Sequence, residues 1–153
     1  MSSEEVKDSG VRRQVRVECS FNAPIREVWD VVTDHRGMNR WLVPGMKITL
    51  DPPGADDPNG VGAERVIHRL GFKGRERVLS FEPPHTMTYT VVSGIPIKNH
   101  LGTLELAERG ADTLVVWTVC FEPIIPGSAK LIEVGLGMVL GGGLRRLAAR
   151  MGR

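Results

Sequence analysis

Residues 46–122 consist of short segments in which apolar and polar side chains alternate, separated by very short connections apart from a loop at 51–62 that is rich in Pro, Gly and Asp. A period of two is typical of strands with one buried face. A parallel crossover needs about a dozen residues, so strands joined by these links must pair as antiparallel neighbours. The expected strands lie at 46–50, 63–69, 72–81, 86–93, 98–107 and 113–122. The sequence therefore predicts a six-stranded antiparallel meander.

Helical patterns flank this meander on both sides. Residues 15–21 alternate as one further strand, and an apolar stripe at helical spacing follows Pro24, which suits a first helical turn. A second short helix is expected at 38–42. After Gly127 the period becomes helical until the end of the chain. Five glycines lie in this last segment, so the sequence leaves open whether the helix bends or breaks at 141–143.

Several short motifs occur in a distinctive order along the chain. They are Ala23–Asp34, Trp41, Gly60–Gly62, Val78–Pro84 and Asp112–Trp117. Together with the order of expected elements, they resemble the START-like superfamily, also called SRPBCC, and in particular its polyketide-cyclase/dehydrase and lipid-transport members. The resemblance covers residues 11–149. It implies an α+β helix-grip fold, in which a seven-stranded curved antiparallel sheet surrounds the C-terminal helix, with two short helices after the first strand and an apolar cavity inside.

Composition limits the classes of function. With 153 residues the chain suits one domain, and we expect a disordered tail at 1–10 and a START-like domain at 11–153. The net charge of +2, without a basic cluster, argues against nucleic-acid binding. No apolar run approaches the roughly 18 residues of a spanning helix, which argues against membrane insertion. The polar N-terminus lacks a secretory signal, so we expect a cytoplasmic protein, a monomer or weak homodimer.

The two cysteines are expected to be free thiols. The family arrangement makes the first and last strands neighbours, which brings Cys19 and Cys120 onto adjacent strands. Cross-strand geometry seldom suits a disulfide, and the cytoplasm disfavours one.

The four histidines show no metal-ligand spacing, so neither a metal site nor a cofactor is expected. We expect His35 and His85 to be exposed in turns. His100 is different, because the period of two places Lys98, His100 and Gly102 on the face of Leu104, toward the helix. A β-bulge near Gly102, or in the turn at 94–97, would reverse His100.

The same parity turns Tyr89, Trp117 and Val119 inward. His100 and Tyr89 would then bring polar atoms into an apolar space, as ligand sites require. Two alternatives are a His100–Tyr89 hydrogen bond at the sheet edge and an exposed histidine. Arg65 and Glu76 should pair across neighbouring strands, either orienting a ligand carboxylate or carbonyl or forming an ordinary ion pair on the outer face.

The last helix should supply the opposite wall. Small residues on a gripped helix leave room for a ligand, so the glycines at 135, 137 and 141–143 are expected to face the cavity. The predicted ligand-binding residues are Arg65, Tyr89, His100, Trp117, Val119, Gly137 and Met138.

These observations favour the binding of a small apolar or amphipathic ligand, such as a lipid, polyketide, sterol or quinone-like molecule, in transport or sensing. One alternative is a cofactor-free polyketide cyclase or dehydratase, in which His100 or Glu76 moves a proton and Arg65 or Tyr89 stabilises an enolate. A titratable group in the cavity would favour this enzyme. The other is a protein-interaction module, which a filled core and an exposed apolar patch would favour.

Overall fold

The computed structural model describes residues 12–43 and 45–152, so the tail expected at 1–10 lies outside the described residues. Its elements are β1 (Arg13–Phe21), α2 (Ile25–Val32), the 3₁₀ helix η1 (His35–Arg40), β2 (Lys47–Leu50), β3 (Glu64–Arg69), β4 (Phe72–Glu82), β5 (Thr86–Ser93), β6 (Ile97–Arg109), β7 (Asp112–Pro123) and α3 (Ala129–Met151). The predicted order of elements is confirmed. The second short helix begins earlier than expected and is a 3₁₀ helix.

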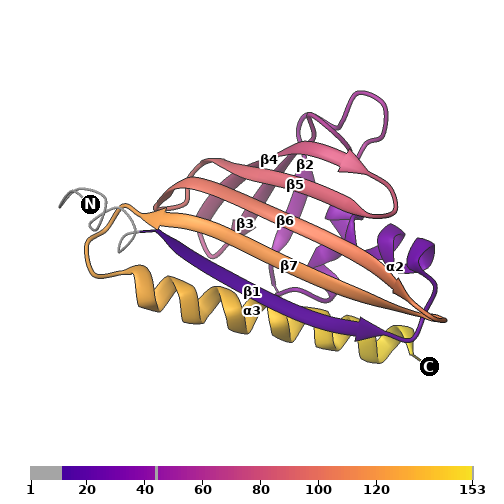
Figure 1. Cartoon of the computed structure of the whole chain (residues 1–153). Helices are drawn as coiled ribbons and strands as arrows, with labels where there is room; N and C mark the ends of the chain where they lie inside the picture. Colours follow the sequence, from indigo (N-terminus) through magenta and orange to yellow (C-terminus); the bar gives the residue numbers. More distant parts are fainter. Residues whose placement is uncertain (1–11, 44, 153) are drawn as a thin grey trace, which may run out of the picture.

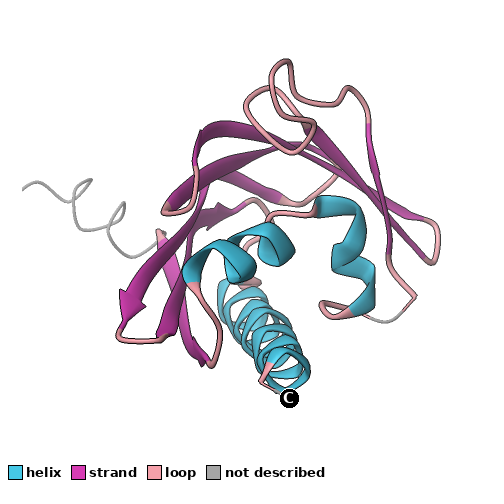
Figure 2. Cartoon of the chain, turned by 90° about the vertical axis from the view of Figure 1, so that its right-hand side faces the viewer, coloured by secondary structure: helices cyan, strands magenta, loops and turns pink. Residues whose placement is uncertain are grey.

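The strands form one seven-stranded sheet in the order β1-β7-β6-β5-β4-β3-β2, and every neighbouring pair is antiparallel. The sheet curves over α3, which runs along its open side (Figure 1). Figure 2 looks along α3 and shows α2 and η1 between the helix and the sheet. The predicted α+β helix-grip fold is confirmed. None of the described helices is long and apolar enough to cross a membrane.

The core occupies the end of the sheet that α2 and η1 close. Val28 and Trp29 of α2 are buried there, together with Leu144 and Leu147 from the second half of α3. The indole rings of Trp41 and Trp117 lie 6.4 Å apart in the same region. Before Leu140, α3 contributes no buried side chain, so packing there is incomplete.

The helix α3 continues without a break through 141–143, which settles the question that its glycines raised. At Gly143 a Cβ atom would lie 2.8 Å from Cδ1 of Leu42 and 3.3 Å from the carbonyl oxygen of Trp41. Real Cβ atoms do not come so close to their neighbours. This glycine therefore allows α3 to approach the segment after η1, and packing offsets its poor helix propensity.

A β-bulge near the start of β6 changes which side chains face inward. The register with β7 shifts between Lys98 and Leu101, where Asn99 has a φ of +49°. One extra residue reverses the parity before the bulge, so Ile97 is buried and Lys98 is exposed. The expectation that Lys98 faces inward is therefore wrong. His100 lies within the shifted stretch and faces inward, with 9% of its surface exposed.

The cysteines lie far apart on the neighbouring strands β1 and β7. Cys19 pairs with Val115 and Cys120 with Gln14, at opposite ends of the ladder. Both are free thiols, as expected.

Candidate ligand-binding cavity

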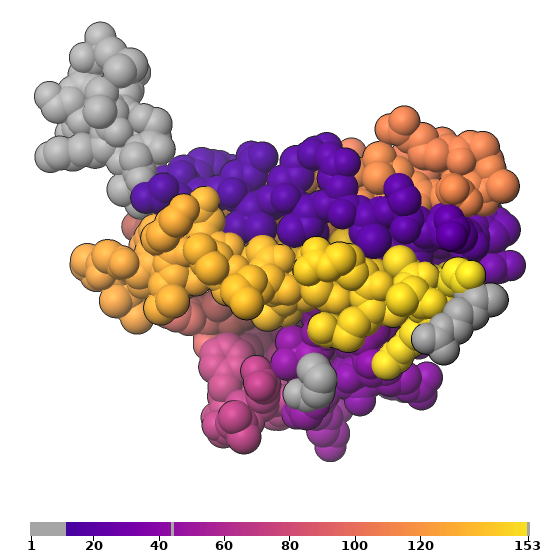
Figure 3. Space-filling view, turned by 90° about the horizontal axis from the view of Figure 1, so that it is seen from below, coloured from indigo at the N-terminus to yellow at the C-terminus, as the bar shows by residue number. Residues whose placement is uncertain are grey.

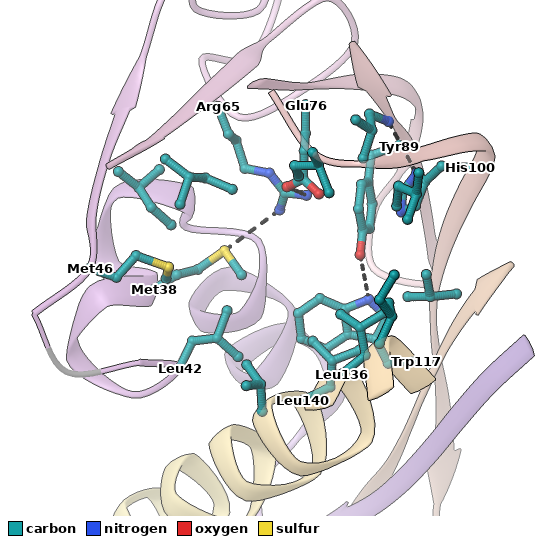
Figure 4. Close-up of a pocket in the computed structure, with 18 residues that line it drawn as sticks. Met38, Leu42, Met46, Arg65, Glu76, Tyr89, His100, Trp117, Leu136 and Leu140 are labelled. Carbon is teal, nitrogen blue, oxygen red and sulfur yellow. Dashed lines mark hydrogen bonds and ion pairs between the residues drawn. The ribbon is translucent and has the colours of Figure 1, made fainter. Parts of the chain in front are cut away.

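A cavity of about 200 Å³ lies between the concave face of the sheet and the first half of α3. Strands β2 to β7 form one wall, and η1 and α3 form the other (Figure 4). Its lining is buried around Tyr89 and Trp117 but partly exposed at Ile67, Ile95 and Val139. The cavity therefore has a closed end, at Tyr89, and a mouth between Ile67, Ile95 and Val139.

Most of the residues predicted from strand parity do line this cavity. They are Arg65, Glu76, Tyr89, His100, Trp117 and Val119. The ladder explains their proximity, because Arg65 stands opposite Glu76 on β4, and Tyr89 of β5 stands opposite Gly102 on β6. Polar side chains from four strands thus meet at the closed end.

Arg65 is the most constrained of these side chains, with 2% of its surface exposed. Its Nη2 lies 2.9 Å from Oε1 of Glu76, and its guanidinium carbon lies 4.3 Å from the centre of the Tyr89 ring. Its Nη1 points to Sδ of Met38 at 3.6 Å. Within the described residues its Nε–H has no partner. The pair lies on the inner face, so the alternative of an ordinary outer-face ion pair is wrong.

His35, which we expected in an exposed turn, is completely buried behind Arg65, so that expectation is wrong. Its Nε2 lies 2.9 Å from the carbonyl oxygen of Asn59, which only accepts hydrogen bonds, so Nε2 carries the proton. Its Nδ1 can then accept from Nη1 of Arg65, 3.4 Å away. Burial, reinforced by the positive charge of Arg65, lowers the pKa of His35 to about 3. A neutral histidine therefore holds the guanidinium in place. His85, by contrast, is exposed.

Tyr89 lies at the centre of the closed end. Its hydroxyl oxygen accepts a hydrogen bond of 2.8 Å from Nε1–H of Trp117 and keeps its own hydrogen available for donation. Burial holds the pKa of Tyr89 well above its usual value, so the hydroxyl stays protonated. Its ring covers Gly102, where a Cβ would lie 2.7 Å from Cε2 and closer still to Cζ. Only glycine at 102 permits this position of the ring.

His100 faces the cavity with a fixed tautomer. The backbone N–H of Val91 donates to its Nδ1 at 3.1 Å, so the neutral ring carries its proton on Nε2. Burial lowers its pKa, and Glu76 opposes part of that shift. The rings of His100 and Tyr89 have centres 5.4 Å apart, and no hydrogen bond joins them in the described structure. The alternative of a His100–Tyr89 hydrogen bond is therefore wrong.

The helix wall is entirely aliphatic, and its residues differ from those predicted. Ile132, Leu136, Val139 and Leu140 line the cavity. Met138 is 70% exposed and points away from the cavity, so its prediction as a lining residue is wrong.

The expectation that the α3 glycines face the cavity is also wrong. A Cβ at Gly137 would lie 3.9 Å from Cγ1 of Val15, and one at Gly141 would lie 3.7 Å from Cγ1 of Val17. Both glycines therefore face β1, about a quarter turn from the cavity, and let α3 pack closely along that strand.

Met38, Leu42 and Met46 also line the cavity, although none of them was predicted as a ligand-binding residue. Met38 belongs to η1, and Leu42 and Met46 lie in the irregular segment between η1 and β2. No group of three or more His, Cys, Asp or Glu side chains that could hold a metal occurs in the described parts of the chain.

Three donors at the closed end lack a described acceptor: Nε–H of Arg65, O–H of Tyr89 and Nε2–H of His100. The Arg65–Glu76 pair brings opposite charges together, so the charge of the guanidinium is balanced locally. The arrangement can hold an acceptor oxygen against one end of an otherwise apolar space.

A curved antiparallel sheet that grips a C-terminal helix around such a cavity defines the START-like, or SRPBCC, class. The chain belongs to the polyketide cyclase / dehydrase and lipid transport family, whose model matches residues 12–152. A comparison with curated proteins finds no match.

Solved structures agree with this assignment. A Thermobifida fusca protein studied by solution NMR is 32% identical over 92% of this chain and 93% of its own, with a TM-score of 0.75. A Bacillus thuringiensis protein is 19% identical over 91% and 98%, with a TM-score of 0.70. Norcoclaurine synthase from Thalictrum flavum, in complex with dopamine and hydroxybenzaldehyde, is 14% identical over 92% and 88%, with a TM-score of 0.66. The last two similarities concern the fold alone.

Proposed function

We propose that this protein binds a small, largely apolar ligand that carries one hydrogen-bond-accepting oxygen. The observation that supports this most is the set of three donors on Arg65, Tyr89 and His100 at the buried end of an apolar cavity. Among the described residues, Nε–H of Arg65 is buried without a partner, which costs free energy, and an acceptor oxygen on the ligand would remove that cost.

The cavity limits the size of the ligand. An apolar protein cavity of about 150 Å³ holds benzene, so about 200 Å³ suits a substituted ring or a short chain. Each Å² of apolar surface removed from water would contribute about 25 cal/mol. A sterol-sized ligand would need the aliphatic helix wall to move outward.

Charge favours a neutral acceptor over a carboxylate. Glu76 lies 2.9 Å from Arg65 and already balances its positive charge. A ligand carboxylate would bring a second negative charge into this buried pair without a second cation, which is costly. A ketone, aldehyde, ester or phenol avoids that cost.

A cyclase or dehydratase is the second candidate, because His100 and Glu76 do line the cavity. Nδ1 of His100 already accepts from Val91, and Glu76 is held by Arg65, so neither is poised to take a proton. The same donors could instead stabilise an enolate oxygen. Chromatography with mass analysis of a captured ligand before and after incubation separates the two: because a cyclisation without loss of water leaves the mass unchanged, binding alone requires both the retention time and the mass to stay the same.

Native mass spectrometry of protein exposed to cell extract tests the proposal. We expect wild type to retain a small neutral compound, and Leu136→Trp, which places an indole in the cavity, to lose it. Gly137→Ala is the matched control on the same helix, because its methyl group would face Val15 rather than the cavity. Equal retention by wild type and Leu136→Trp would contradict the proposal.

A further inference from the structure

The first half of α3 is apolar on every side, which the cavity does not explain. From Leu131 to Leu144 the only charged residue is Glu133. Helices that are apolar all round are normally buried. Yet Leu131 is 76% exposed, Met138 70% and Val134 49%.

A second exposed apolar site lies beside the mouth of the cavity, at the turn between β3 and β4. Leu70 is 95% exposed and Phe72 43%. They share a shallow depression with Met46 and Ile67, which also line the cavity. Figure 3 shows this turn and the first half of α3 on one face of the molecule. We call Leu70, Phe72, Leu131, Val134 and Met138 together the apolar face.

The charges around the apolar face have one sign. In segments 66–75 and 124–146, every exposed charged side chain is basic, namely Arg69, Lys73, Lys130, Arg145 and Arg146. The acidic Glu133 is partly buried, with Oε2 3.9 Å from Nη1 of Arg13. Although the net charge of the whole chain is small, positive charge is therefore in local excess next to these exposed aliphatic side chains.

We propose that the apolar face docks on an anionic lipid surface, with the mouth of the cavity directed toward the membrane. Binding to a membrane surface strengthens with the apolar area that is buried in it and with electrostatic attraction to anionic lipids, and the apolar face with its neighbouring Lys and Arg side chains offers both. Each basic residue near an anionic surface strengthens the attraction to it. Leu131 and Met138 protrude from α3 and are 76% and 70% exposed, so they suit insertion into a fluid lipid layer better than packing against a rigid protein.

Docking in this orientation would let an apolar ligand pass between bilayer and cavity without crossing water. This consequence rests on the proposed function, whereas docking itself does not. A variant with the cavity filled, Leu136→Trp, should therefore still bind membranes while losing its ligand. Failure of docking and failure of ligand binding are thus separate results.

Flotation with lipid vesicles tests the docking. We expect wild type to bind vesicles of phosphatidylcholine with phosphatidylglycerol. The Leu131→Ser/Met138→Ser variant should bind them more weakly by a factor of about ten or greater, because two aliphatic groups no longer insert. Lys130→Glu/Arg69→Glu should lose the preference for the anionic lipid. Leu79→Ser is the matched control, since Leu79 is 46% exposed but does not belong to the apolar face. Thermal unfolding confirms that each variant is folded.

Three flotation results would overturn the proposal. They are no flotation of wild type, equal flotation with phosphatidylcholine alone, and unchanged flotation of the Leu131→Ser/Met138→Ser variant. A concentration-dependent dimer of wild type in sedimentation equilibrium that the same variant abolishes would show a second copy on this face instead. Retention of an acidic protein on the apolar face without flotation would likewise overturn it.

Discussion

The strand wall and the helix wall of the cavity are built on opposite principles. The strand wall carries Arg65, Glu76, Tyr89 and His100, and ladder pairing, an ion pair and hydrogen bonds fix these groups. The helix wall offers four aliphatic side chains from α3, and its outer side is exposed.

The strand wall is therefore expected to recognise the ligand, and the helix wall to control its entry. Polar groups in a low-dielectric site are useful only when their geometry is fixed, and a sheet with defined register provides that. Aliphatic side chains have no required orientation, so the helix wall can shift to admit ligands of different shapes. Changes on the strand side should therefore affect stability and selectivity strongly, whereas equivalent changes on the helix side should affect mainly size and entry.

The largest effect is expected at Arg65. Arg65→Met would leave the Glu76 carboxylate buried without its cation, so we expect the free energy of unfolding to fall by about 3–5 kcal/mol. Urea denaturation measures this loss. The control is Arg77→Met, because Arg77 pairs with Glu64 and its side chain is 46% exposed, so its loss should cost at most about 1 kcal/mol. Recovery in Arg65→Met/Glu76→Leu would support the account, and similar losses in the two single variants would contradict it.

Alanine substitutions of one glycine in β6 and one glycine in α3 allow the stability of the two walls to be compared. Gly102→Ala would push the Tyr89 ring off β6, and we expect a loss of about 1–3 kcal/mol in the free energy of unfolding. Gly135→Ala on α3 meets no atom within 4 Å, so better helix propensity should stabilise the protein by about 0.5–1 kcal/mol. Denaturation curves of the two variants provide the test. Effects of the same sign would show that the walls do not differ as described.

The last of these effects is a pH dependence, which is small near neutral pH and grows as the pH falls. Burial lowers the pKa of His35 from its ordinary value of 6.5 to about 3. As the pH falls between these values, the unfolded chain takes up a proton that the folded protein does not. The free energy of unfolding should therefore fall by about 1.4 kcal/mol per pH unit through this group. Wild type should lose stability on acidification more steeply than His35→Gln by this amount, and parallel curves below pH 6.5 would contradict the assignment.

Strand parity predicted one wall of the site from the sequence. Short connections required antiparallel pairing, and the period of two then placed Tyr89, Trp117 and Val119 inward, where they lie. The predicted direction of Lys98 was wrong, because the alternation of apolar and polar residues does not reveal a bulge of one residue.

Strand parity could not predict which residues of α3 line the cavity, nor that the side chain of His35 supports Arg65. An apolar stripe broad enough to cover most of α3 does not say which side faces the sheet, so Gly137 and Met138 were placed on the wrong side. His35 begins the short 3₁₀ helix η1 and Asn59 lies in the loop between β2 and β3, so no apolar period predicts the direction of either side chain. The contact of His35 with Arg65 spans 30 residues, and only tertiary packing determines it.

The central claim is that the strand wall presents donors to a ligand oxygen. Calorimetric titration with acetophenone and ethylbenzene tests it most directly, because the two probes are similar in size and differ in one carbonyl oxygen. The account predicts that wild type binds acetophenone about two- to tenfold more tightly, as one net hydrogen bond allows, although ethylbenzene is the more apolar molecule. Equal or tighter binding of ethylbenzene would contradict the claim.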